Sequence, residues 1–213
     1  MKIILASDLS FLLKYGYDLT GISKSEMKIG YVITASKGSR DKTFLEKVKN
    51  SMIENRILFE EIDIEGKSKD EMFNFFKNKN VIHVEGGNTF YLLKAIRESG
   101  FAEVLKELLN EGKIYIGTSA GAYIMCPTIE VANWNETGRD RFGLTDFSSL
   151  NYVPFVLKVH YKDEAGKLIK EKMKTLKYPL RILRDGQGIL VENNKYTFIG
   201  GGKLFYENSS FKK

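Results

Sequence analysis

A serine flanked by small residues is the feature of this sequence with the clearest chemical meaning. Gly117-Thr118-Ser119-Ala120-Gly121 follows an apolar run and leads into a segment with a helical pattern. A Gly-x-Ser-x-Gly at a strand-to-helix turn is typical of a nucleophile elbow, in which the serine hydroxyl projects above the end of the strand. The N–H of Ala120 would then point to where an oxyanion forms. The motif alone also occurs as a tight turn with an incidental serine, so the interpretation depends on the flanking elements.

A serine nucleophile needs a base, and the sequence contains two histidines, His83 and His160. His83 lies within the apolar run 81–84, where we expect a buried structural role. His160 ends another apolar run and is followed by polar residues, which places it to reach Ser119 from a loop. We therefore interpret His160 as the general base.

The acid that would orient the histidine is less sharply defined. Asp185 ends an apolar run and precedes a glycine. An aspartate in this position could instead bond to its own backbone within the turn. Other acids near the site in sequence are Glu136, Asp140 and Asp163. Position alone favours Asp185.

A second glycine-rich turn, Glu85-Gly86-Gly87-Asn88-Thr89, also follows an apolar run and precedes an apolar-periodic segment. Paired glycines let backbone N–H groups approach a ligand closely. Gly87 is therefore a candidate for a second oxyanion donor beside Ala120. Asn88 or Thr89 could equally be a helix N-cap. The two interpretations are compatible, because a cap leaves other N–H groups free.

Strands and helices in alternation must bring these turns together. Apolar runs and helical spacing predict strands at 2–6, 30–35, 57–63, 80–84, 113–117 and 152–159 and helices at 43–56, 67–77, 89–98, 101–111 and 163–176. We also expect Leu12, Leu13 and Tyr17 to share one helical face, and Gly200–Gly202 to form a hairpin turn. The alternation predicts an α/β fold in one domain over residues 1–213. Its sheet would be doubly wound and mostly parallel, with the site at the carboxyl edge.

Composition narrows the class of function. In a chain of 213 residues, 43% hydrophobic residues are ample for a packed core. The chain has one cysteine, Cys126, no cluster of residues with metal-ligand spacing and no nucleotide-binding motif. We therefore expect no metal and no other cofactor. The net charge of +6 is spread among acids, which predicts a solvated surface and no nucleic-acid partner. No membrane span or signal peptide is evident, so we expect a cytoplasmic protein. The sequence leaves a homodimer open.

Three motifs together resemble the aspartyl dipeptidase (peptidase E) family of serine peptidases, which is related to cyanophycinase. They are Gly-Gly-Asn-Thr-Phe at 86–90, Tyr-Ile-Gly-Thr-Ser-Ala-Gly-Ala at 115–122 and Cys-Pro-Thr-Ile at 126–129. The spaced agreement runs from about residue 80 to 192. The resemblance implies a flavodoxin-like fold akin to that of the class I glutamine amidotransferases.

The resemblance also implies roles for individual residues. Ser119 matches the nucleophile and His160 the histidine, whereas Asp185 stands where the family typically has a glutamate before glycine. The N–H groups of Gly87 and Ala120 would be the oxyanion donors. Acyl transfer would then follow the course of a Ser-His-Asp triad.

Two departures from the family pattern concern the substrate. Asn133 is followed by Trp134 where the family pattern has an Asn-Asp pair, so an acid that would contact substrate is missing unless Glu136 replaces it. The helix predicted at 163–176 carries lysines and no arginine, although such enzymes use an arginine there for an aspartyl carboxylate. Lysine lacks the bidentate fork of arginine. The sequence therefore does not predict strict specificity for an N-terminal aspartate.

The sequence predicts a serine peptidase that hydrolyses short peptides, as a dipeptidase does. We expect Asn88 and Lys167 to contact the substrate and the polar segment 133–150 to form a wall that limits the site to di- or tripeptides. Two alternatives stay open: a cyanophycinase-like or other amide hydrolase on the same scaffold, and a catalytically silent binding protein.

Overall fold

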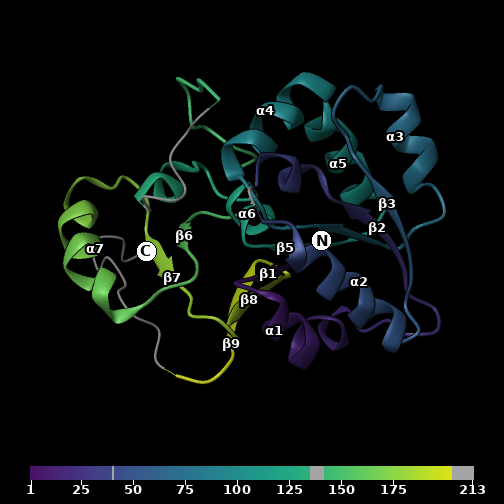
Figure 1. Ribbon diagram of the computed structural model, residues 1–213, viewed down its shortest axis with the longest axis horizontal. Helices are drawn as coiled ribbons and strands as arrows, with labels where there is room; N and C mark the ends of the chain where they lie inside the picture. The colour runs from purple at the N-terminus through teal and green to yellow at the C-terminus, as the bar shows by residue number, and fades with distance from the viewer. Residues whose placement is uncertain (40, 135–141, 203–213) are drawn as a thin grey trace.

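A seven-stranded sheet runs through the centre of the computed structural model, which describes residues 1–39, 41–134 and 142–202 (Figure 1). The strand order is β3-β2-β4-β5-β1-β8-β9. The first five strands in this order pair in parallel, and β8 and β9 add an antiparallel hairpin beside β1. The strand bounds are β1 Lys2–Ala6, β2 Lys28–Val32, β3 Leu58–Ile62, β4 Val81–Val84, β5 Ile114–Thr118, β8 Gly188–Glu192 and β9 Lys195–Ile199.

Helices cover both faces of the sheet, as the alternating pattern predicts (Figure 1). One face carries α1 Leu9–Phe11 and α2 Thr43–Glu54. The opposite face carries α3 Lys69–Phe76, α4 Thr89–Ser99, α5 Phe101–Asn110 and the short α6 Ala120–Tyr123. The α/β, doubly wound fold is thus confirmed.

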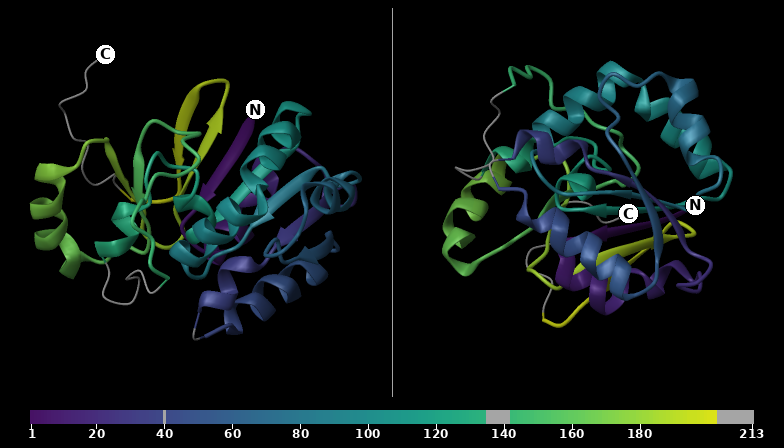
Figure 2. Two further views of the ribbon diagram at one scale, coloured as in Figure 1. Left: turned by 90° about the horizontal axis from the view of Figure 1, so that it is seen from above. Right: turned by 45° about the vertical axis from the view of Figure 1, so that its right-hand side comes forward.

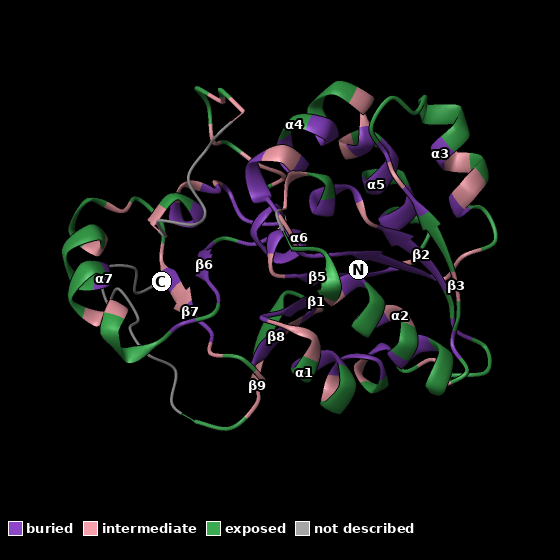
Figure 3. Ribbon diagram, viewed as in Figure 1, coloured by how far each residue is buried: buried purple, intermediate pink, exposed green. Residues whose placement is uncertain are grey.

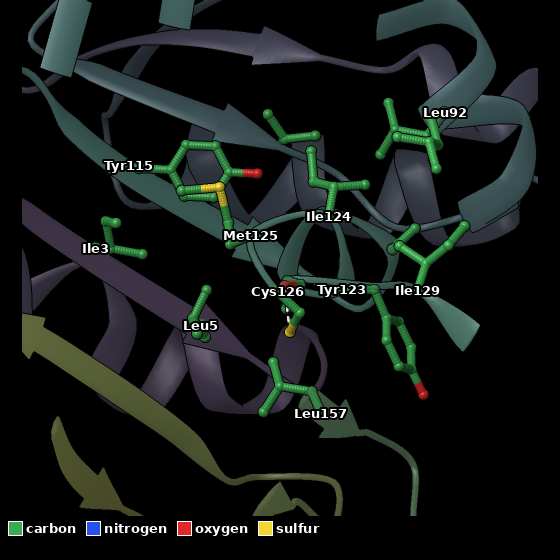
Figure 4. Packing of buried hydrophobic residues seen from close by; sticks show 14 of the residues in the cluster. Ile3, Leu5, Leu92, Tyr115, Tyr123, Ile124, Met125, Cys126, Ile129 and Leu157 are labelled. Carbon is green, nitrogen blue, oxygen red and sulfur yellow. Dashed lines mark hydrogen bonds between the residues drawn. The ribbon is translucent and has the colours of Figure 1, made fainter. Parts of the chain in front are cut away.

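Alternate residues of the strands enter two separate cores. In β1, Ile3 and Leu5 join the cluster under α4 and α5, whereas Ile4 and Ala6 join the cluster under α1 and α2. Period-two alternation with both sets buried is what a sheet covered on both faces requires. Figure 3 shows the resulting buried residues along the central strands, and Figure 4 shows part of the first cluster. Cys126 packs there as a small buried residue, as expected, and burial raises its pKa to about 12.

A small lobe lies to one side of the main sheet (Figure 2). Its core is a parallel pair, β6 Val156–Lys158 and β7 Leu180–Ile182. The connection between them contains α7 Gly166–Lys172, which is flanked by the 3-10 turns Asp163–Ala165 and Met173–Thr175. The strand predicted at 152–159 is thus only three residues long in the structure. On its N-terminal side, Pro154 has no N–H to donate to a neighbouring strand. On its C-terminal side, the backbone turns at His160, whose φ is 54°.

Two further sequence predictions are wrong in detail. Leu12 and Tyr17 are buried, but Leu13 is 49% exposed. The chain there forms a π-helical turn, in which the Tyr17 N–H donates to the Leu12 carbonyl, and the wider turn rotates Leu13 outward.

The second error concerns the C-terminal hairpin. The turn between β8 and β9 is Asn193-Asn194, whereas Gly200–Gly202 follow β9. Both asparagines have positive φ, 51° and 60°. A two-residue hairpin turn needs this conformation, and asparagine tolerates it.

No helix in the described residues has the length and apolarity that crossing a membrane would require.

Candidate active site

The predicted nucleophile elbow is present at the end of β5. Ser119 stands between β5 and α6 with φ 48° and ψ −102°, a conformation that few non-glycine residues adopt. The glycines on either side are required by close backbone packing. A Cβ on Gly117 would lie 2.4 Å from the Gly121 carbonyl oxygen, and a Cβ on Gly121 would lie 2.0 Å from the Val84 carbonyl oxygen. The motif therefore holds α6 directly against β4 and β5 and fixes the serine at the carboxyl edge of the sheet.

A continuous chain of hydrogen bonds joins Ser119, His160 and Asp185. The distance from His160 Nε2 to Ser119 Oγ is 3.0 Å, and from His160 Nδ1 to Asp185 Oδ1 it is 2.6 Å. The serine comes from the main sheet, whereas the other two follow β6 and β7 in the small lobe. The structure thus brings together the three residues that the sequence singled out.

Two residues that the sequence analysis did not select support this arrangement. The backbone N–H of His160 donates to Ser7 Oγ at 3.2 Å, and Ser7 Oγ donates to Asp185 Oδ1 at 3.4 Å. Asp8 Oδ1 accepts from the Gly186 N–H at 2.8 Å and so holds the turn that carries Asp185. Both residues directly follow β1. The rule that strand carboxyl ends meet at one edge of a parallel sheet could have identified them.

The glycine-rich turn after β4 lies directly beside the serine. A Cβ on Gly86 would be 3.3 Å from Ser119 Cβ. Gly87 has φ 140°, and a Cβ there would be 2.4 Å from the Ala35 carbonyl oxygen, so only glycine fits. In the described part of the chain, neither the N–H of Gly87 nor that of Ala120 donates to another protein group. Both expected oxyanion donors are therefore available near Ser119.

A cavity of about 250 Å³ opens beside the serine. Leu9 of α1 and Phe44 and Val48 of α2 give it an apolar wall. Its polar lining comes from the carboxyl ends of the strands and from the histidine. The lining residues are Ser7, Asp8, Leu9, Phe44, Val48, Glu85, Gly86, Gly87, Thr118, Ser119 and His160.

The Glu85 carboxyl is buried and accepts hydrogen bonds from two neutral groups. Its Oε2 accepts from the Tyr31 hydroxyl at 2.7 Å, and its Oε1 accepts from the Gly86 N–H at 2.6 Å. Burial raises the pKa of Glu85 to about 6. His83 is also buried, and its Nε2 lies 2.9 Å from Thr118 Oγ1. Burial lowers the pKa of His83 to about 3, so this histidine is neutral and structural, as the sequence predicted.

Neither of the two residues expected to contact substrate is among the residues that line the cavity beside Ser119. Asn88 is the N-cap of α4, and its Oδ1 accepts from the Tyr91 N–H at 2.9 Å. Lys167 is exposed on α7 and is not among the residues that line the cavity. Their roles in substrate binding stay predictions.

The other acids considered near the site are placed elsewhere. Asp163 pairs with Arg184 on the lobe. Glu136 and Asp140 lie outside the described residues. The described parts of the predicted wall, 133–134 and 142–150, do not line the cavity. The second part packs over α4, with Phe147 against Phe90 at a ring-centroid distance of 5.5 Å. In the described ranges no group of three or more His, Cys, Asp or Glu side chains is placed to hold a metal ion.

Comparisons with known proteins point to a family of peptidases. The family model of Peptidase family S51 matches residues 12–201. An uncharacterized peptidase of Pasteurella multocida is 30% identical over 207 residues, which are 95% of this chain and 99% of that protein. An uncharacterized peptidase of Listeria monocytogenes is 32% identical over 182 residues, 85% of this chain and 86% of that protein. A peptidase E of Escherichia coli is 39% identical over 85 residues, 40% of this chain and 35% of that protein.

A solved structure extends the agreement to the fold. The crystal structure of a Listeria monocytogenes protein assigned by its name to peptidase E superposes with a TM-score of 0.82 at 23% identity. The match covers 94% of this chain and 98% of that one. At this level of identity the similarity establishes the flavodoxin-like fold.

Proposed function

Since the chain belongs to peptidase family S51, we propose that it is a serine peptidase that hydrolyses short peptides. Ser119 is the nucleophile, His160 the general base and Asp185 the acid that orients the imidazole. The observation that carries this proposal is the chain of contacts at 2.6 and 3.0 Å from Asp185 through His160 to Ser119. A serine hydroxyl becomes a useful nucleophile when a base accepts its proton, and the Nε2 contact provides that base.

The proposed reaction has two half-reactions. Ser119 Oγ attacks the peptide carbonyl carbon while its proton moves to His160 Nε2, and the tetrahedral oxyanion accepts hydrogen bonds from the N–H groups of Gly87 and Ala120. The C–N bond then breaks as Nε2 returns the proton to the leaving amine, which leaves an acyl-serine. A water molecule gives a proton to His160 and attacks the ester carbonyl. Ser119 recovers its proton as the carboxylic acid departs.

Asp185 is shorter by one methylene than the glutamate to which the resemblance points. The Asp185 carboxylate nevertheless lies 2.6 Å from His160 Nδ1. Asp8 holds the Asp185–Gly186 turn through the Gly186 N–H. In this position the Asp185 carboxylate favours the tautomer with the proton on Nδ1 and leaves Nε2 free to accept from serine.

The size of the cavity supports a short substrate. Ligand clefts for small molecules usually measure about 300–1,000 Å³, and the cavity beside Ser119 measures about 250 Å³. Such a volume suits one or two amino-acid residues better than an extended chain.

Covalent labelling with a fluorophosphonate, followed by peptide mapping and a dipeptide hydrolysis assay, tests the proposal. We expect wild type to be labelled at Ser119 and to hydrolyse dipeptides. Ser119→Ala should not be labelled and should lose about 10⁴-fold or more in kcat/KM. The matched control is Ser99→Ala, which removes a serine hydroxyl that donates to the Ala95 carbonyl at the end of α4. A wild-type protein that is neither labelled nor active would overturn the proposal, and so would full activity in Ser119→Ala.

A further inference from the structure

Among the residues that the structure describes, the cavity beside Ser119 is lined by two carboxylates and by no lysine or arginine. The carboxylates are Asp8 and Glu85, and their surroundings differ. Asp8 is only partly buried and accepts from the backbone N–H groups of Phe11 and Gly186 and from a serine hydroxyl. Glu85 is 1% exposed. The charge of Glu85 therefore has to be balanced inside the protein or by whatever enters the cavity.

No cation of the described chain balances Glu85. Its hydrogen-bond donors, the Tyr31 hydroxyl and the Gly86 N–H, are neutral. His83 Nε2 lies 3.7 Å from Glu85 Oε2, but that imidazole is neutral above about pH 3. A buried carboxylate without a positive partner destabilises the fold, and such groups concentrate where a protein binds or transforms a ligand.

Glu85 retains the capacity to bind a ligand. An ionised carboxylate has about four acceptor positions on its two oxygens, and the two hydrogen bonds found here use one on each oxygen. Its neighbour in the chain, Gly86, lies against Ser119. The Glu85 side chain and the serine that would be acylated thus line the same cavity.

We propose that Glu85 selects substrates by binding a cationic group on the amino-terminal residue of the peptide. This inference rests on the proposed peptidase function and names its substrate class. The residue attached to the attacked carbonyl lies over Ser119, and the cavity opens beside that serine. The cation is either the α-ammonium group or the side chain of lysine or arginine. An acidic side chain in the cavity would instead meet the like charges of Glu85 and Asp8.

The apolar wall fits this substrate class. Leu9, Phe44 and Val48 line the same cavity as Glu85. Lysine and arginine pack their methylene stems along apolar surface while the charged end finds a polar partner. The cavity therefore offers a partner to both parts of a long cationic side chain, and an α-ammonium group would use the carboxylate alone.

Protection of Ser119 against fluorophosphonate labelling separates the two sources of the cation. Four ligands are compared: norleucine amide, with the α-ammonium only; N-acetyl-lysine amide, with the side-chain ammonium only; lysine amide, with both; and N-acetyl-norleucine amide, with neither. We expect the ligand without a cation to protect about tenfold more weakly than the best cationic ligand, as for the loss of a charged hydrogen bond. The better of the two single-cation ligands identifies the source.

The variants assign the effect to Glu85. Glu85→Gln keeps the shape and the acceptor of the side chain, and we expect it to reduce the advantage of the cationic ligands to within about twofold. Glu85→Asp retains the charge and should keep part of the advantage, and it provides the test if the glutamine variant does not fold. The matched control is Glu111→Gln, an exposed carboxylate just before the amino end of β5 that should protect as wild type does.

Equal protection by all four ligands on a labelled enzyme would overturn this inference and leave the peptidase function intact. A cation advantage that persists undiminished in both Glu85 variants would do the same. If wild-type Ser119 is not labelled without ligand, the peptidase proposal itself fails and the inference falls with it.

Discussion

The two halves of the candidate site are built in different ways. The half on the main sheet contains Ser119 and the Gly86-Gly87 turn, which lie at the carboxyl ends of buried central strands. The half on the small lobe contains His160 and Asp185, whose side chains are 44% and 58% exposed. The first half is fixed by backbone against backbone, and the second by a few hydrogen bonds to the end of β1.

Because of this difference, we expect substitutions in the two halves to affect different properties of the protein. On the sheet, an added methyl group at the elbow would collide with main-chain atoms that cannot move independently. On the lobe, an altered side chain meets solvent, and an exposed ion pair contributes little to folding. Changes on the lobe should therefore reduce catalysis in a folded protein, whereas changes at the elbow should reduce stability.

The largest effect on the lobe is expected for Asp185→Asn. An amide can turn its NH₂ toward His160 Nδ1 and so stabilise the tautomer with the proton on Nε2, which cannot accept from Ser119. We expect kcat/KM and the rate of fluorophosphonate labelling to fall on the order of 10³-fold. The midpoint of thermal unfolding should stay within a few degrees of wild type.

Asp163→Asn is the matched control for this variant, because Asp163 is an exposed acid of the same lobe that pairs with Arg184. It should change activity less than about threefold. Activity of Asp185→Asn within threefold of wild type would show that Asp185 does not orient the base. A large loss of stability would break the distinction between the two halves.

The largest effect on the sheet is expected for Gly121→Ala. The new Cβ would lie 2.0 Å from the Val84 carbonyl oxygen, so α6 would have to move away from β4. We expect the free energy of unfolding in urea to fall by at least about 3 kcal/mol. Gly201→Ala is the control, because nothing lies within 4 Å of a Cβ there. Equal stability of the two variants would mean that the elbow can relax.

The sequence predicted the sheet half because its signals are local. The elbow at 117–121 and the turn at 85–89 each combine a strand, a glycine-rich turn and a helix within about a dozen residues. The strand order brings them to the same edge without further information.

The lobe half was predicted less completely because it depends on contacts between distant segments. Asp185 was one of several candidate acids, and the bond between Ser7 and Asp185 joins residues 178 positions apart. The role proposed for Glu85 depends on the described residues placing no cation beside it, which only the packed structure can show. Local patterns do not record such contacts.

The smallest predicted effect tests the electrostatic cost of burying Glu85 in the sheet half of the site. Burial raises the pKa of Glu85 from its ordinary 4.5 to about 6. Between these values the folded protein holds a proton that the unfolded chain has released, so the contribution of Glu85 to stability decreases as the pH rises through this window. For one group the decrease is roughly 2 kcal/mol. Above about pH 6 the whole penalty is present.

Urea unfolding of wild type and Glu85→Gln from pH 4 to 8 measures this penalty. The glutamine does not titrate, so the variant should gain roughly 2 kcal/mol on wild type between the two ends of the range. Tyr17, Tyr31 and His83 face Glu85 and do not compete, because burial raises the pKa of both tyrosines and keeps the histidine neutral above about pH 3. Glu111→Gln should follow wild type in parallel. If the Glu85→Gln curve is also parallel to wild type, Glu85 titrates as an exposed acid does, and its burial in the sheet half carries no electrostatic cost.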